Sequence, residues 1–501
     1  MDRGSLPLAR AGYMNCRVLI AFCKITTSHT DSTISPLALS TFSACEVVRF
    51  SAEATGRADG PHAHVMKTSS SDRPSLHSAI AARRHVVGDD THMLLTDTRT
   101  GRELIVGTRE WQTLSEADGT RDLEGIRIAL RRHGRRVSIA HLVAFFDTLR
   151  EVDFIGEVLQ APEPSPPHLG FSDSALVMPL KDYRFRCNGA GHCCETYGSI
   201  LFSHQEALVA RGSCPDVLDG GHNTTSPFTP ERGGIPSGPL CVTRVEGACA
   251  YLGDERRCSI HAAAGAQSKP KGCQLFPITY FHDGEHIQLS VRPECVCVFQ
   301  SLDDPDAPTL EAASPGADSP LPSWVPVRQL AESVSLDENI QLTRGEYRVW
   351  RDELAGRLGD SDLITNLWQR CSVISFQEAL SRVQTQLTTL VGRRSLWDAR
   401  EGFVMRTLER WQQALSLDLA ESDTAHDFDP YEALAFRAAL YGGDWTEAPT
   451  LHDGMQRLLI AVVCARKLTA ASSVTHDTSL ANVLAVARAT GLWDAVELRQ
   501  V

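Results

Sequence analysis

Cysteine placement constrains this chain more than any other feature of its 501 residues. Ten of the fifteen cysteines lie between Cys187 and Cys297, and two of them, Cys193 and Cys194, are neighbours. A disulfide between neighbours needs a strained geometry, although each of the two thiols could still pair with a distant cysteine. The clustering therefore favours a metal site or reactive thiols, with a disulfide framework as the alternative.

The composition narrows the class of protein. Apolar residues make up 42% of the chain and charged residues 22%, as in ordinary globular proteins. The formal net charge of −13 disfavours broad nucleic-acid binding, which needs a basic surface. No apolar run reaches the roughly 18 residues that span a bilayer, and the apolar stretch at 18–23 is short for a secretory signal. We therefore expect a cytoplasmic protein without a membrane partner, in which thiols stay reduced.

Changes in composition along the chain predict an α+β protein with several domains. A proline-rich linker at 161–170 and an acidic linker at 302–323 separate its parts. We expect a mostly disordered segment at 1–83, a hairpin-and-helix module at 84–160, a small cysteine-rich domain with few strands at 171–300 and a mostly α-helical domain at 324–501.

The module at 84–160 begins with two short segments, 92–97 and 102–106, which predict a β-hairpin joined by the turn TRTG. Three short helices follow, the third of them started by Ser138, and 152–155 closes the module as a strand. This order resembles a winged helix, and most of all the PqqD-like peptide-binding modules. The resemblance implies a protein or peptide partner for the module.

Helical periodicity dominates the last part of the chain. Apolar residues recur at helical spacing in three segments, at 374–392, 403–420 and 455–468. Cys371 and Cys464 fall on apolar faces of this region, where an inert buried thiol is expected.

Common catalytic motifs are missing from the sequence. It contains no G-x-S-x-G, H-E-x-x-H or P-loop motif, and the pair Cys295 and Cys297 has the wrong spacing for a thioredoxin-like site. His282 and His286 have helical spacing, but the intervening Asp-Gly predicts two strands joined by a turn.

The cysteine-rich segment contains four blocks with a recognisable order. Thiolates bind zinc and iron–sulfur clusters, and Gly189 and Gly191 allow a tight loop between the first cysteines. The blocks are CNGAGHCC at 187–194, ILFSHQEALVARG at 200–212, ACAYLGDERRCSIH at 248–261 and KPKGCQLFP at 269–277. Together they resemble the YkgJ-type cysteine-cluster family, whose members chelate zinc or iron. In the second block, Ser203 and Glu206 predict a capping box at the start of a helix.

The resemblance implies a set of metal ligands within 183–297, under a quarter of the chain. The candidate ligands are Cys187, Cys193, Cys194, Cys249, Cys258 and Cys273, followed by Cys295. The family's block CxxCGxCC would place a further cysteine at Ala190. Either the site uses fewer thiolates, or Cys241, Cys295, Cys297 or His192 supplies the replacement. Six or seven thiolates exceed the four ligands of one tetrahedral zinc, which indicates a polynuclear site or additional structural thiols.

A second resemblance extends further along the chain. The segment IQLSVRPECVC at 287–297, followed by the helical region at 324–501, resembles the layout of flagellin lysine-N-methylases. This resemblance supports Cys295 as a ligand and implies a transferase that uses S-adenosylmethionine. The residues themselves give no independent support for that cofactor, because no Gly-rich loop of the dinucleotide-binding type follows a strand.

The sequence therefore predicts a metal-binding protein that carries zinc or an iron–sulfur cluster in a cysteine-cluster domain. The alternative is a protein lysine N-methylase-like transferase, in which the helical domain binds a protein substrate. A third class is an adaptor that delivers or senses metal. Whether the protein is an enzyme stays open at this stage.

Overall fold

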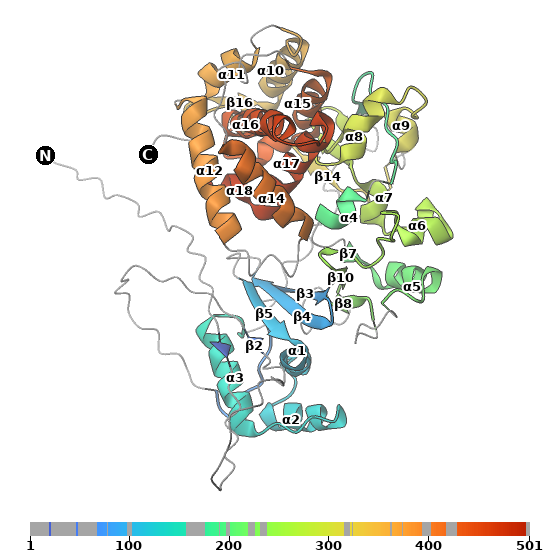
Figure 1. The fold of residues 1–501 in the computed structure, drawn as a ribbon, viewed down its shortest axis with the longest axis vertical. Coiled ribbons are helices and arrows are strands. Elements are labelled where there is room, and N and C mark those ends of the chain that lie inside the picture. The colour runs from blue at the N-terminus through green and yellow to red at the C-terminus, as the bar shows by residue number, and fades with distance from the viewer. Residues whose placement is uncertain are drawn as a thin grey trace, which may run out of the picture. The chain divides into compact units, whose positions relative to one another are not determined.

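The computed structural model describes 20–21, 47–48 and most of 68–156, 176–314 and 321–496. Within these limits the residues outside the description are 78, 98–102, 190, 197–200, 219–225, 231–237, 323, 361–362, 373, 393–401 and 417–427. The fold is mixed α+β, with several small sheets and a helical C-terminal region (Figure 1). The chain divides into two compact units, the first from Met1–Glu163 and Leu218–Thr243, the second from Pro164–Val217 and Arg244–Val501.

The first unit contains three antiparallel strands and three helices around one core. These elements are β3 (Ile80–Val87), β4 (Asp90–Asp97), β5 (Glu103–Gly107), α1 (Thr108–Ser115), α2 (Leu123–Arg132) and α3 (Ile139–Glu151). Ser138 caps α3, as the sequence predicts, and accepts a hydrogen bond from the N–H of His141. Phe146 is fully buried, and burial of such a side chain contributes about 1.5–3 kcal/mol.

Three features of the first unit differ from the sequence-based expectations. The first long strand starts at Ile80, inside the segment expected to be mostly disordered. The expected closing strand at 152–155 is reduced to an isolated bridge between Ile155 and Leu76. Residues 218–243 belong to this unit and not to the cysteine-rich part. They contain the antiparallel strands β8 (Phe228–Pro230) and β9 (Leu240–Val242). Arg84 on β3 donates to the carbonyl of Ser226 in this segment at 2.6 Å. The predicted turn TRTG lies outside the described residues. A further pair of short strands, β1 (Ile20–Ala21) and β2 (Val47–Val48), is antiparallel.

A four-stranded sheet in the second unit has the order β14 (Val327–Gln329), β12 (Ile278–His282), β13 (Ile287–Val291) and β6 (Val177–Pro179). The central pair is antiparallel, which confirms the predicted hairpin, whereas both outer strands pair in parallel. Asp283 holds the hairpin turn by accepting the N–H groups of Glu285 and His286. Burial raises the pKa of Asp283, but these hydrogen bonds and the ion pair with Arg351 at 2.8 Å lower it by a larger amount. The net pKa lies below the ordinary value, so the carboxylate stays charged.

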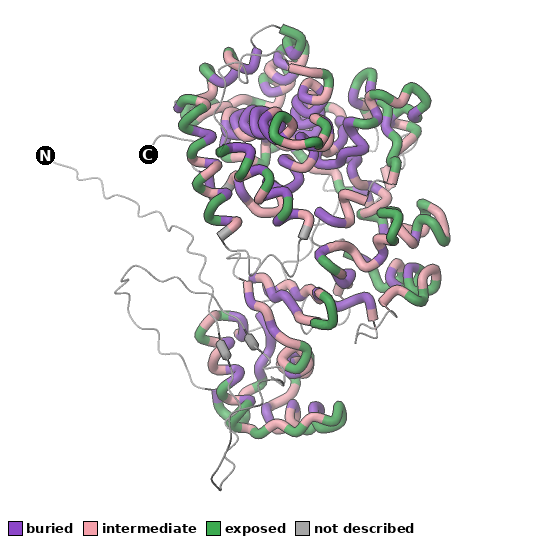
Figure 2. The backbone as a smooth tube through the Cα atoms, viewed as in Figure 1, coloured by how far each residue is buried: buried purple, intermediate pink, exposed green. Residues whose placement is uncertain are grey.

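The C-terminal region is mostly helical, and its helix α15 (Pro430–Gly442) packs against this sheet. The other helices of the region are α10 (Arg344–Gly356), α11 (Leu363–Cys371), α12 (Phe376–Gly392), α14 (Gly402–Leu415), α16 (Leu451–Ala470), α17 (His476–Thr490) and α18 (Leu492–Ala495), with the small hairpin β15 (Ser333–Ser335) and β16 (Gln341–Thr343). The three long helices expected here are present as α12, α14 and α16. Figure 2 shows α16 buried along most of its length, as its apolar sequence predicts for a central helix.

The cysteine-rich segment and the C-terminal helices share one hydrophobic core, although their sequences suggest separate domains. Ser290 on β13 donates to the carbonyl of Ala438 on α15 at 2.9 Å, and Tyr347 on α10 donates to the carbonyl of Leu440 at 3.1 Å. Both faces of β13 are covered, because all five of its residues are buried, and Ser290 lies on the face that meets α15.

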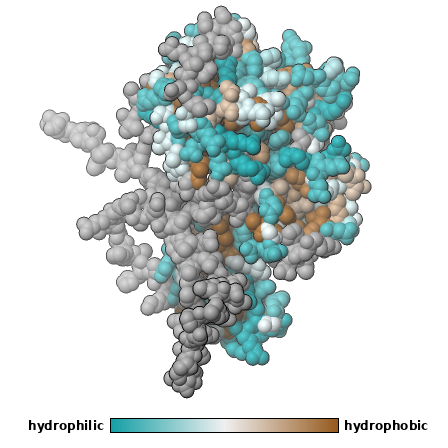
Figure 3. All heavy atoms as spheres, in the orientation of Figure 1, coloured by the Kyte–Doolittle hydropathy of each residue, from teal (hydrophilic) through white to brown (hydrophobic). Residues whose placement is uncertain are grey.

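Among the described residues, no helix is long and apolar enough to cross a membrane. The face of the helical region that Figure 3 shows is mostly hydrophilic, with scattered apolar side chains.

Candidate thiol-lined metal centre

Three stretches of the second unit carry the candidate ligands. In the first, Cys187 precedes a tight loop, and Cys193 and Cys194 lie in the short helix α4 (His192–Thr196). Gly191 has φ +75°, and a Cβ there would lie 2.5 Å from the carbonyl oxygen of Arg256. Glycine is thus required twice over, for the left-handed backbone and for the close approach of the second stretch.

The second stretch supplies three further cysteines. Cys249 ends the short strand β11 (Ala248–Cys249), which pairs with β10 (Arg244–Val245). Cys258 precedes α6 (Ser259–Ala264), and Cys273 lies in α7 (Lys271–Leu275). Before this stretch, α5 (His204–Ser213) carries the predicted capping box, which the structure confirms with both of its hydrogen bonds. Glu206 of that box also accepts the N–H of Lys271 at 2.7 Å and so links α5 to α7.

The third stretch follows β13. Cys295 precedes α8 (Val296–Gln300), Cys297 lies within that helix, and both are buried. Cys297 donates from Sγ to the side-chain oxygen of Asn188 at 3.0 Å, so the third stretch contacts the first.

Seven cysteines from these stretches line one pocket of about 710 Å³, a volume typical of small-molecule and cofactor sites. They are Cys187, Cys193, Cys194, Cys258, Cys273, Cys295 and Cys297. All seven are free thiols. The described lining contains no aspartate or glutamate but four cationic side chains, Lys269, Arg256, Arg257 and Arg292.

Close sulfur contacts raise several thiol pKa values. Cys193 and Cys194 have their Sγ atoms 4.0 Å apart, and this contact, burial and the nearby Cys187 raise the pKa of Cys193. Contact with Cys297 and burial raise the pKa of Cys187. For Cys297 itself, contact with Cys187 lowers the pKa, but contact with Cys295 and burial raise it to about 12. Without a metal, these thiols therefore hold their protons at neutral pH.

Lys269 is the cation that the thiols influence most directly. Burial lowers its pKa, but the thiols of Cys187 and Cys273 and their neighbours raise it above its ordinary value. A buried ammonium beside several sulfurs stabilises thiolates, because opposite charges attract strongly away from water. The positive lining thus suits the net negative charge of a thiolate-bound metal.

An ion pair that sequence reasoning missed braces the first stretch against the second. Glu195 follows Cys194 directly, and its two carboxylate oxygens each accept from Arg256 at 2.7 Å. Arg244 also donates to the backbone carbonyl of Glu195 at 2.7 Å. The acidic-basic run GDERR was visible in the sequence, but nothing local indicates which of its charges meets Glu195.

The structure distributes the other candidate ligands as follows. Cys249 does not line the pocket but contacts Cys194, whose pKa it raises. His192 lines the pocket, with its ring 5.7 Å from that of Phe403 in an edge-to-face contact. Cys241 lies in the first unit on β9, and Ala190 falls outside the described residues.

Among the described residues, the thiols form no group of three within 4.8 Å of one another, and the group of potential metal ligands that does lie this close consists of Asp429, Glu432 and His476. Both oxygens of Glu432 accept from the guanidinium of Arg466, at 2.7 and 2.6 Å, and His476 adds a bond of 3.0 Å. Since a guanidinium already occupies the carboxylate, this group is a buried ion-pair network and not a metal cage.

Comparison of the chain with family models, curated proteins and solved structures finds no match. The resemblances noted from the cysteine blocks and from the helical layout therefore stay predictions.

Proposed function

We propose that this protein binds iron, as an iron–sulfur cluster, or zinc in the thiol pocket. The observation that carries the proposal is the convergence of seven free thiols, far apart in sequence, on one pocket with a cationic lining. Soft thiolates select these metals, and the donor set therefore fits both. Because the thiols bind metal as thiolates, loading releases protons and grows stronger as pH rises.

The spacing of the sulfurs favours a polynuclear centre over a single zinc. Four thiolates around one zinc would lie about 3.8 Å apart, as tetrahedral Zn–S bonds require. Among the described cysteines, no three sulfurs lie within 4.8 Å of one another. The thiols surround a space larger than one ion, as iron–sulfur ligation needs. Its ligands would come from the seven lining cysteines, Cys187, Cys193, Cys194, Cys258, Cys273, Cys295 and Cys297.

Anaerobic purification with elemental analysis and a visible spectrum tests this proposal. Iron with matching sulfide and a broad visible absorption would identify a cluster, whereas stoichiometric zinc without colour would identify a zinc site. Cys193→Ser and Cys273→Ser should lose most of the metal, and the matched control Cys371→Ser should keep it. Equal metal content in all three variants, or no metal in the unaltered protein, would refute the proposal.

The size of the thiol pocket also supports the alternative that the protein is a transferase. Its volume leaves room beside a metal centre, and Arg257 and Arg292 could bind the carboxylate of a cofactor such as S-adenosylmethionine. Calorimetry on the metal-loaded protein tests this alternative. Binding that disappears in Cys273→Ser but survives in Cys371→Ser supports it, and absence of binding leaves a metal-binding or metal-sensing protein.

For the first unit we propose a winged-helix-like, peptide-binding role. Three strands and three helices around one core support it, together with the exposed Ile128 on α2, an apolar side chain available for contact. Selection of peptides on the full chain, repeated with Ile128→Asp, tests the role. Peptides that bind both proteins equally well would count against this face.

A further inference from the structure

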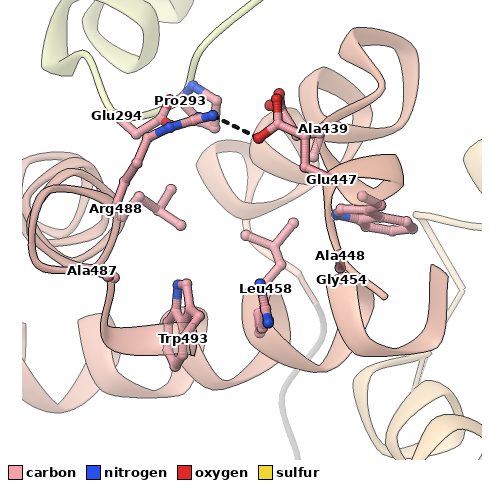
Figure 4. A pocket seen from close by; sticks show the side chains of 15 residues that line it. Pro293, Glu294, Ala439, Glu447, Ala448, Gly454, Leu458, Ala487, Arg488 and Trp493 are labelled. Carbon is pink, nitrogen blue, oxygen red and sulfur yellow. Dashed lines mark hydrogen bonds and ion pairs between the residues drawn. The ribbon is translucent and has the colours of Figure 1, made fainter. Parts of the chain in front are cut away.

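A second pocket, of about 360 Å³, lies in the helical region of the second unit (Figure 4). Its walls come from α15, α16, α17 and α18, from the 3₁₀ turn η4 (Asp444–Glu447), and from Pro293 and Glu294. It shares no lining residue with the thiol pocket. The two pockets are nevertheless neighbours in sequence, since Arg292 and Cys295 line the first and the two residues between them line the second.

Negative charge gathers on one side of this pocket. Glu294 is buried, with its side chain 7% exposed, and its Oε1 accepts from Arg488 at 2.6 Å. Its other oxygen, Oε2, is buried without a hydrogen-bond partner. Leaving a charged oxygen in this state is costly, and a donor from a ligand would remove the cost.

Two more carboxylates lie beside Glu294. Figure 4 shows Arg488 reaching from α17 to Glu447, at 2.8 Å. Asp444 accepts from Arg328 at 2.8 Å, yet burial and the charge of Glu294 still raise its pKa to about 6. Arg457 also lines the pocket, and Arg328, Arg292 and Arg488 all lower the pKa of Asp444, so the carboxylates already have cationic neighbours. The buried Oε2 of Glu294 is nevertheless an acceptor without a donor, and a ligand could supply that donor.

Apart from the guanidinium of Arg457, much of the remaining lining is apolar and aromatic. Trp445 and Trp493 contribute indole rings, and Leu458, Leu484 and Ala487 contribute aliphatic groups. Indole faces attract cations and also pack against apolar rings. The pocket thus presents a carboxylate end and an aromatic body to one small molecule.

From this arrangement we propose that the second pocket binds a small organic amine, with its ammonium group donating to Glu294 and Asp444 and its apolar body packed against Trp445 and Trp493. The volume lies at the lower end of the range for ligand sites, which suits a compact molecule with a single ring. The ligand site is independent of the metal proposed for the thiol pocket.

Calorimetric titration of the full-length protein with three matched probes tests this proposal. 2-Phenylethylamine carries the expected charge, 2-phenylethanol is neutral, and phenylacetate is negative. The amine should bind at least ten times more tightly than the alcohol, and phenylacetate should not bind. Equal affinities for amine and alcohol, or no binding of the amine, would overturn the proposal.

Two substitutions sharpen the test. Glu294→Gln keeps the shape and the acceptor for Arg488 but removes the charge, and it should weaken amine binding at least tenfold without changing the affinity for the alcohol. Asp444→Asn should weaken it in the same direction and covers the case in which the first variant fails to fold. The control is Glu353→Gln, which also removes one negative charge but at an exposed position on α10. Unaltered amine binding in the two pocket variants would contradict the assignment, and metal analysis of the same samples keeps the result separate from the thiol pocket.

Discussion

Loss of the carboxylate of Glu195 should loosen the thiol pocket without removing a single sulfur. In Glu195→Ala, two charge-assisted hydrogen bonds of 2.7 Å to Arg256 disappear, and with them the link between the stretch of Cys193 and that of Cys258. Glu195 is 11% exposed and Arg256 47% exposed, so water can replace part of the interaction on the arginine side. Hydrogen bonds to charged groups contribute about 1.5–3 kcal/mol, and after allowance for that exposure we expect a loss of about 1–2 kcal/mol.

Thiol labelling of the metal-free protein measures this loss locally. Buried cysteines react through transient opening, so a loss of about 1–2 kcal/mol should accelerate labelling roughly 5- to 30-fold. Mass spectrometry would follow the reaction at Cys193 and Cys273, with Cys371, a thiol outside the pocket, as an internal reference. The control is Glu255→Ala, which removes an exposed carboxylate next to Arg256. Equal labelling rates in the two variants would show that the ion pair does not hold the pocket together.

Three further substitutions test other parts of the second unit. Glu432→Gln leaves the guanidinium of Arg466 beside a buried, uncharged side chain and should lower the free energy of unfolding by about 3–5 kcal/mol in urea titrations. A loss below about 1 kcal/mol would contradict the role of this ion pair. Asp444 has a raised pKa, so the folded protein binds its proton more tightly than the unfolded chain and loses stability as pH rises from about 4 to about 6. The free energy of unfolding of Asp444→Asn should therefore equal that of the unaltered protein near pH 4 and exceed it by at most about 3 kcal/mol at pH 7. A difference in this free energy that stays constant from pH 4 to pH 7 would refute the assignment. Gly443→Ala should cost more than about 1 kcal/mol, because φ is +71° and the new Cβ would lie 2.5 Å from the ring of Phe281, whereas Gly356→Ala, with open space at its Cβ, should be neutral or slightly stabilising.

Local elements could be predicted well because neighbouring residues determine them. The capping box of Ser203 and Glu206, the cap at Ser138 and the β12–β13 hairpin all depend on contacts within a few residues. The long helices follow from apolar periodicity in the same way. The strand at Ile80 was missed because its sequence, IAARRHVV, carries charges on a strand whose burial depends on distant partners.

The candidate site divides along the same line. Spacing and residue type indicated which cysteines belong together, and six of the seven candidate ligands do line one pocket. The exception is Cys249, which contacts Cys194 but does not line the pocket. Cys297, which was not among the seven candidates, does line it. A spacing pattern cannot distinguish these two positions, because both depend on how β11 and α8 pack against the first loop.

The sequence by itself determined which residue types could form a site, namely clustered thiols on glycine-containing loops, and where the helical region lies. Tertiary structure alone decided which groups share a space: Lys269 beside the thiols, Glu195 opposite Arg256, and Glu294 facing a second pocket one residue away from Cys295. The physical reason is the distance along the chain between the residues that interact. Helix caps, turns and periodicity arise from free energies between near neighbours, whereas burial and electrostatic environment arise from the packing of segments that lie far apart along the chain.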